Sequence, residues 1–158
     1  MKTLILGLGN PILGDDGVGL RVIEELKNRL DKQDITIEGA SLAGLDLLDL
    51  LSGYDRAIII DAIQTGGRAG RIYRLNPESF TATSHASTPH DVNFATALKL
   101  GQRLGVALPG KIDILAIEVA DTSRFSEECT PEVAAAIPAC VEMVMRTING
   151  DGDLTPDL

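Results

Sequence analysis

The sequence has few aromatic and few basic residues. Aromatics make up 3% of the chain and tryptophan is absent, so a surface on which nucleic-acid bases or sugars stack has almost nothing to be built from. Lys and Arg number 14 against 23 Asp and Glu, for a net charge of −9. Because nucleic-acid affinity depends on neutralising phosphates with basic side chains, we expect no nucleic-acid partner.

Cysteines and long apolar runs are also scarce. The two cysteines, Cys129 and Cys140, are too few and too far apart for a cysteine-ligated metal site. Such sparse use of cysteine is typical of proteins in a reducing compartment. The first apolar run, residues 4–6, is shorter than the ~7–15 residues of a signal peptide. No run approaches the ~20 residues of a membrane span. We therefore expect a soluble, cytoplasmic protein with no membrane partner.

The chain has a length of 158 residues, which indicates a single domain. We expect this domain to span residues 1–149 and to be followed by a frayed acidic tail at 150–158. Apolar periodicity predicts strands at 4–6, 35–37, 57–60, 71–75 and 111–119, helices at 18–30, 45–51, 91–104 and from 131 onward, and a loop at 77–88.

This alternation of strands and helices predicts an α/β sandwich with helices on both faces of a mainly parallel sheet. The link at 65–70 is too short for a crossover helix, so strand 71–75 should run antiparallel to strand 57–60. Ligands of such sheets bind at the carboxyl ends of the strands, near the point where the strand order reverses.

The turn at 7–17 is the first candidate site, because it follows the first strand and opens a helix as a dinucleotide-binding loop does. However, Ile12 stands where the third glycine of that fingerprint is required. Asp15 and Asp16 would also repel a pyrophosphate, by about 4 kcal/mol for charges ~4 Å apart at an effective dielectric near 20. A helix-capping role explains Asp15 but leaves the second acid unexplained.

Asp61 directly follows the predicted strand 57–60. An acid in this position often caps a turn. If the first and third strands are neighbours, however, their carboxyl ends meet, and Asp16 and Asp61 converge on the ligand-binding edge of the sheet.

His90 is the third candidate. It follows a capping threonine and a proline, so it should lie in the first turn of a helix, where the positive end of the dipole disfavours imidazolium. The neutral imidazole is the form that binds metals. The alternative is a surface histidine beside a cap. Together with Asp16 and Asp61, His90 would suit a borderline divalent cation with open coordination positions.

Three further residues are weaker candidates. Cys140 falls on an apolar helical face and is expected in the core. Cys129 has no evident base beside it. The segment 39–44 resembles a nucleophile elbow around Ser41, but its second glycine is replaced by Ala43 and a helix cap is the simpler interpretation.

Four short motifs share one order and spacing with a known family. They are GLGN at 7–10 with DDGVG at 15–19, IIDA at 59–62, PH at 89–90 and TPEV at 130–133. Over residues 1–148 the chain resembles the hydrogenase maturation endopeptidases. These proteases remove the carboxy-terminal extension from the large subunit of nickel–iron hydrogenases.

The resemblance implies a three-layer α/β/α sandwich whose five-stranded mixed sheet has the order 2-1-3-5-4, with strand 4 antiparallel. It implies that Asp16, Asp61 and His90 are the catalytic and metal-contacting residues. The nickel would be carried by the hydrogenase large-subunit precursor and would not be a permanent cofactor. Family members often have Glu at the position of Asp16, so the shorter side chain would change the coordination geometry. Which group activates water stays open.

Two other functions compete with this interpretation. GLGNP at 7–11 also begins peptidyl-tRNA hydrolases, which need a histidine soon after the motif and a basic face. Here the next histidine is His85 and the net charge is −9. The other competitor is a non-enzymatic nucleotide-binding or assembly module that uses the glycine-rich first turn.

Overall fold

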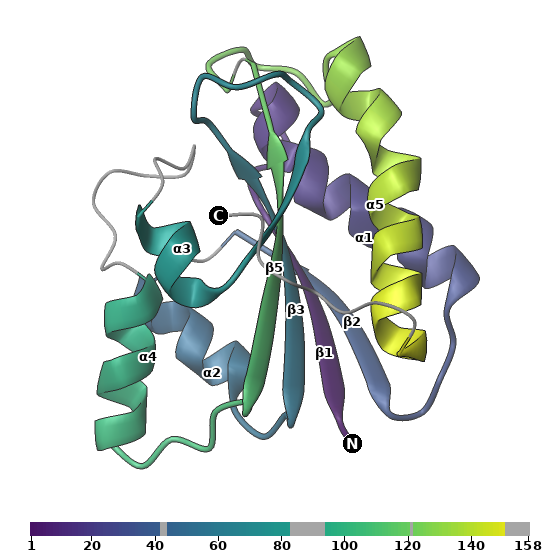
Figure 1. The fold of residues 1–158 in the computed structure, drawn as a ribbon. Coiled ribbons are helices and arrows are strands. Elements are labelled where there is room, and N and C mark those ends of the chain that lie inside the picture. Colours follow the sequence, from purple (N-terminus) through teal and green to yellow (C-terminus); the bar gives the residue numbers. More distant parts are fainter. Residues whose placement is uncertain (42–43, 83–93, 121, 151–158) are drawn as a thin grey trace.

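The structure is a computed structural model that describes residues 1–41, 44–82, 94–120 and 122–150 (Figure 1). Its centre is one five-stranded sheet of order β2-β1-β3-β5-β4. The strands are β1 (Thr3–Leu8), β2 (Ile35–Ala40), β3 (Arg56–Ile63), β4 (Ile72–Leu75) and β5 (Lys111–Glu118). All neighbouring pairs are parallel except β4 with β5, which is antiparallel. The strand order and the direction of β4 are therefore confirmed.

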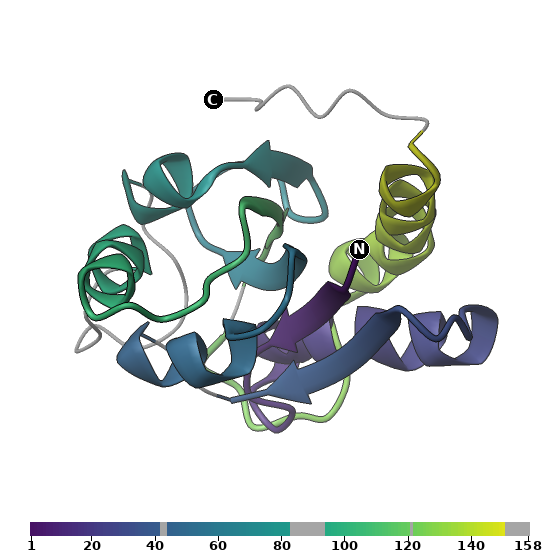
Figure 2. The ribbon, with the colours of Figure 1, turned by 90° about the horizontal axis from the view of Figure 1, so that it is seen from below.

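Helices cover both faces of the sheet, as expected for three layers (Figures 1 and 2). One face carries α1 (Val18–Arg29) and α5 (Pro131–Asn149), and the other carries α2 (Leu47–Leu51), α3 (Pro77–Ala82) and α4 (Phe94–Arg103). Each face has its own apolar core, and β1 and β3 contribute to both. These two strands are apolar on both sides because they lie in the middle of the sheet.

The loop predicted at 77–88 is wrong for its first part, where α3 forms instead. The side-chain oxygen of Asn76 accepts a hydrogen bond from the backbone N–H of Ser79 at 2.8 Å, and Pro77 occupies the first helical position, so the helix begins with a cap and a proline. Phe80, 5% exposed, anchors the turn in the core. Residues 83–88 lie outside the described part.

The helix predicted at 91–104 is present as α4 within the described residues, and Cys140 is fully buried, as predicted. No helix among the residues that the structure describes has both the length and the apolar character needed to cross a membrane.

The carboxyl ends of β1 and β3 lie side by side, with β2 and β5 outside them. The strand order therefore reverses between β1 and β3, which is where an α/β sheet binds its ligands.

Candidate functional site

Asp16 lies in a 3-10 turn, η1 (Gly14–Gly17), which connects the end of β1 to α1. Its carboxylate is 5% exposed. Oδ2 accepts a hydrogen bond from the backbone N–H of Asn10 at 2.9 Å, whereas Oδ1 is buried and has no hydrogen-bond partner in the described structure. Burial raises the pKa of Asp16, and the Asn10 N–H lowers it by a smaller amount. One oxygen of this carboxylate is therefore buried without a partner that would offset the loss of hydration.

Two glycines bring this turn against the strand ends. A Cβ on Gly9 would lie 2.0 Å from the carbonyl oxygen of Asp16, and the φ of Gly9 is +147°. A Cβ on Gly19 would lie 2.5 Å from the carbonyl oxygen of Ile60 and 2.7 Å from that of Leu8. Because only glycine leaves room for these approaches, Asp16 can sit directly above the junction of β1 and β3.

Asp61 belongs to β3, which continues to Ile63 and does not end at residue 60 as predicted. The side chain is 3% exposed and its Oδ1 accepts a hydrogen bond from the backbone N–H of Ala62 at 2.8 Å. Burial raises the pKa of Asp61 well above its ordinary value; the Ala62 N–H lowers it, and the negative charge of Asp16 raises it again. The charge of Asp16 thus acts on Asp61, as expected if both carboxylates lie at the same edge of the sheet.

This pair of acids has no basic partner within the described residues. The three ion pairs there involve other carboxylates, those of Glu24, Asp113 and Glu142. Two buried carboxylates without a counter-charge are unfavourable unless they bind a proton or a cation. The pair offers oxygen ligands for a divalent ion, but two ligands alone do not complete a site, and the described part contains no group of three metal-binding side chains.

His90, the expected third ligand, lies outside the described residues, as does His85. Its contribution to the site therefore stays a prediction.

Asp15 does not cap α1, and neither does Asp16; Gly17 occupies the cap position without a side-chain hydrogen bond. Instead, the fully buried carboxylate of Asp15 accepts hydrogen bonds from the backbone N–H of Thr130 at 2.7 Å and from its hydroxyl at 2.9 Å. The two adjacent acids thus have different roles. Asp15 connects the turn to the start of α5, and Asp16 faces the site.

Glu118 is a buried acid that the sequence did not single out. It lies at the end of β5 and is fully buried. Its carboxylate accepts hydrogen bonds from the N–H and the hydroxyl of Thr65, from the N–H of Gly67 and from the hydroxyl of Tyr73. These donors occupy both oxygens, so Glu118 fixes the loop that follows β3.

The weaker nucleophile candidates have structural contacts. The Ser41 hydroxyl donates to the carbonyl oxygen of Gly9 at 2.8 Å, so it stabilises the first turn. Cys129 is half-buried; burial and the negative charge of Asp15 raise its pKa, and Arg21 lowers it. A raised pKa reduces the thiolate fraction, which is the reactive form.

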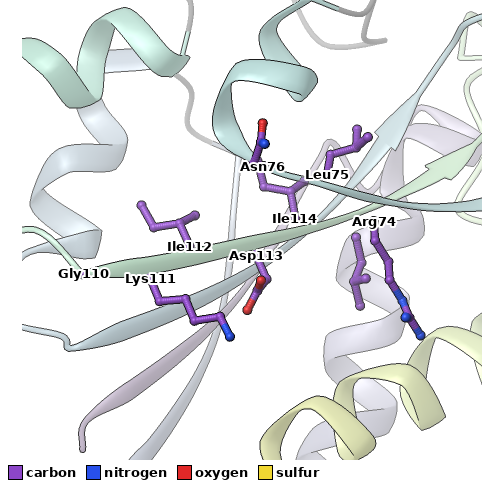
Figure 3. Close-up of a pocket in the computed structure, with 9 residues that line it drawn as sticks. Arg74, Leu75, Asn76, Gly110, Lys111, Ile112, Asp113 and Ile114 are labelled. Atoms are coloured by element: carbon purple, nitrogen blue, oxygen red, sulfur yellow. The ribbon is translucent and has the colours of Figure 1, made fainter. Parts of the chain in front are cut away.

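A pocket of about 280 Å³ lies elsewhere, on the outer edge of the sheet (Figure 3). It is lined by residues 74–76 at the end of β4 and 110–115 at the start of β5. The carboxylate in it, Asp113, forms an ion pair with Arg56 at 3.1 Å. Because the pocket adjoins the amino end of β5, it lies away from Asp16 and Asp61 at the carboxyl ends.

The site is thus a pair of buried acids at the strand-order reversal of a mixed α/β sheet, and known proteins share this fold. The chain is similar to the hydrogenase maturating endopeptidase HybD from Escherichia coli, with a TM-score of 0.81 and 27% identity over 96% of this chain and 94% of that one. It is 29% identical to the hydrogenase 2 maturation protease of Escherichia coli strain K12, covering 96% of this chain and 93% of that protein. The hydrogenase expression/formation protein HupD of Rhizobium leguminosarum bv. viciae is 26% identical, with 96% and 76% covered.

The family model for hydrogenase maturation proteases matches residues 20–147. The chain belongs to this family, so it is a protease of hydrogenase maturation, and the resemblance of its motifs is confirmed. Because the chain belongs to this family, we reject the two competing functions, a peptidyl-tRNA hydrolase and a nucleotide-binding module.

Proposed function

We propose that this protease removes the carboxy-terminal extension of a nickel–iron hydrogenase large-subunit precursor after nickel has been inserted. In this proposal Asp16, Asp61 and His90 contact the nickel that the precursor carries. The observation that supports it is the buried, uncompensated carboxylate pair, in which the Oδ1 atom of Asp16 has no hydrogen-bond partner among the described atoms.

The electrostatics of the pair favour a substrate that carries a cation. Burial raises the pKa of both acids, and the charge of Asp16 raises that of Asp61 further. A nearby cation has the opposite effect, because it favours the ionised form of each carboxylate. A precursor that brings a divalent ion therefore gains two anionic oxygen ligands, and a precursor without the ion meets two acids that are costly to ionise.

The same groups can serve the cleavage. An acid whose pKa lies nearer to neutrality is a more effective proton acceptor than an ordinary carboxylate. A carboxylate beside the ion can accept a proton from the attacking water, and a divalent ion can polarise the scissile carbonyl. The weaker thiol and hydroxyl candidates, Cys129 and Ser41, are not needed as nucleophiles.

We place this reaction in the cytoplasm. Cys129 and Cys140 are both free thiols, as is typical of proteins in a reducing compartment.

The experiment is to incubate the purified protein with candidate large-subunit precursors and to determine the masses of the products. We expect one precursor to lose a carboxy-terminal peptide. Asp61→Asn should abolish that loss, whereas Asp49→Asn, which changes an exposed acid on α2, should not. Intact precursors after incubation with the wild-type protein would refute the proposal.

A further inference from the structure

Two apolar side chains are exposed on the loop that leads to Asp16 and on the segment bridged to it. Phe125 is 84% exposed and Ile12 is 48% exposed. The other four aromatic residues of the chain, Phe80, Phe94, Tyr54 and Tyr73, are buried or half-buried. A single exposed apolar residue is common, but these two lie together.

The backbone places Ile12 and Phe125 side by side. Leu13 and Ser126 form a parallel bridge, in which the Ser126 N–H donates to the Ile12 carbonyl at 2.9 Å and the Gly14 N–H donates to the Ser126 carbonyl at 2.8 Å. In parallel pairing, residues directly beside each other point to the same side. One residue back along both segments, Ile12 therefore lies beside Phe125.

The loop that carries Ile12 also positions the carboxylate of Asp16 in the proposed site. Its Asn10 N–H donates to Oδ2 of Asp16 at 2.9 Å, and the Asp16 N–H donates to the Leu13 carbonyl at 3.2 Å. The exposed pair therefore lies on the same loop that positions Asp16.

The charges around the pair favour one kind of occupant. The exposed acids Glu127 and Glu128 follow Phe125, and one base, Arg124, precedes it. Arg21 is a second base nearby, since its guanidinium donates to the Glu127 carbonyl and pairs with Glu24. Asp16 and Asp61 are buried, so the exposed charge here is that of three acids and two bases, on a chain whose net charge is −9. Opposite charge speeds association and selects partners, so a segment with basic side chains fits this surface.

We propose that Ile12 and Phe125 form a docking surface for the protein substrate, where they bind an apolar side chain within a basic segment of the precursor. This inference depends on the proposed function, because the occupant is the substrate of that reaction. A second copy of the chain fits less well. Two copies that each carry a net charge of −9 repel one another, and two side chains are far from the ~800 Å² per partner of a stable interface.

The test measures processing rates at several precursor concentrations for Phe125→Ala, Ile12→Ala and the control Leu104→Ala. Leu104 is 70% exposed and follows α4, which covers the face of the sheet opposite to α1. Loss of an apolar anchor weakens the binding of the substrate and of the transition state equally. We therefore expect Phe125→Ala to raise KM about tenfold or more with kcat within about twofold, Ile12→Ala to raise KM less, and Leu104→Ala to change neither.

Unchanged KM in both site variants would overturn the docking surface, and so would a fall in kcat alone. Concentration-dependent dimerisation that Phe125→Ala abolishes would also overturn it, by making a second copy the occupant. The activity of the wild-type protein separates failure of the docking surface from failure of the proposed function. If it processes a precursor while the variants behave like it, only the docking surface fails. If it processes no precursor, the proposed function fails as well.

Discussion

The carboxylate of Asp15 binds both the backbone N–H and the hydroxyl of Thr130, at 2.7 Å and 2.9 Å. A third donor, the N–H of Ala120, lies 3.4 Å from Oδ2. These contacts connect the turn before α1 to the segment after β5 and to the start of α5. The position of the neighbouring Asp16 therefore depends on a hydrogen-bond network that spans most of the chain.

Asp15→Asn should lower the free energy of unfolding by about 2 kcal/mol. The asparagine NH2 group is a donor, and it takes the place of one of the two acceptor oxygens that bind the Thr130 and Ala120 donors. Thr130→Val removes only the hydroxyl and should cost about 1 kcal/mol. Urea unfolding of both variants measures these values. Equal stabilities of Asp15→Asn and wild type would show that the network contributes little.

Asp61→Asn should stabilise the protein at neutral pH. The pKa of Asp61 is raised well above the ordinary value of 3.8, so the folded state binds more protons than the unfolded state once the pH exceeds that value. Wild-type stability therefore falls as the pH rises from about 3.8 through the raised pKa. Asparagine can still accept from the Ala62 N–H and carries no charge.

Each unit of pKa shift corresponds to about 1.4 kcal/mol. We expect Asp61→Asn to be more stable than wild type by at least about 1 kcal/mol at pH 7, and the difference to disappear below about pH 4. Thermal unfolding between pH 4 and pH 7 measures it, with Asp49→Asn as the exposed control. A variant that is less stable than wild type at pH 7 would contradict the desolvation argument.

Gly19→Ala should destabilise the fold although alanine favours helices by about 1 kcal/mol. Its Cβ would lie within 2.7 Å of two carbonyl oxygens, those of Leu8 and Ile60, and such overpacking costs about 1–3 kcal/mol. Gly110 is the matched control, since a Cβ there meets nothing within 4 Å. Chemical denaturation should show a loss for Gly19→Ala and a change within about 0.5 kcal/mol for Gly110→Ala.

Asp16→Asn, Asp61→Asn and His90→Ala should each reduce precursor processing by at least about a hundredfold, the usual contribution of an acid–base group. Circular dichroism and thermal unfolding should show that each variant stays folded. Wild-type processing rates in all three folded variants would rule these residues out of the reaction.

The sheet could be predicted from the sequence because its signals are local. The apolar runs of β1 and β3 indicate central strands, and the short link before β4 indicates its antiparallel direction. Asp61 was found because it directly follows three isoleucines, at 58–60, on such a strand. The expectation that Asp16 and Asp61 lie at one edge follows from the strand order alone.

The errors have two causes. The loop predicted at 77–88 overlooked a local signal, the Asn76 cap and Pro77 at the start of α3, with Phe80 as its anchor. The role of Asp15 has no local signal, because its partner Thr130 is 115 residues away in the chain. An acid before a helix is normally a cap, and only the packing of α5 against α1 shows that this one is not.

The central claim is that Asp16 and Asp61 bind a nickel ion carried by the substrate, so that cleavage requires this ion. The most direct measurement compares the processing of nickel-loaded and metal-free forms of the same precursor, with the product masses followed over time. We predict that the wild-type protein cleaves only the nickel-loaded form and that Asp61→Asn cleaves neither. Efficient cleavage of the metal-free precursor by the wild-type protein would contradict the claim.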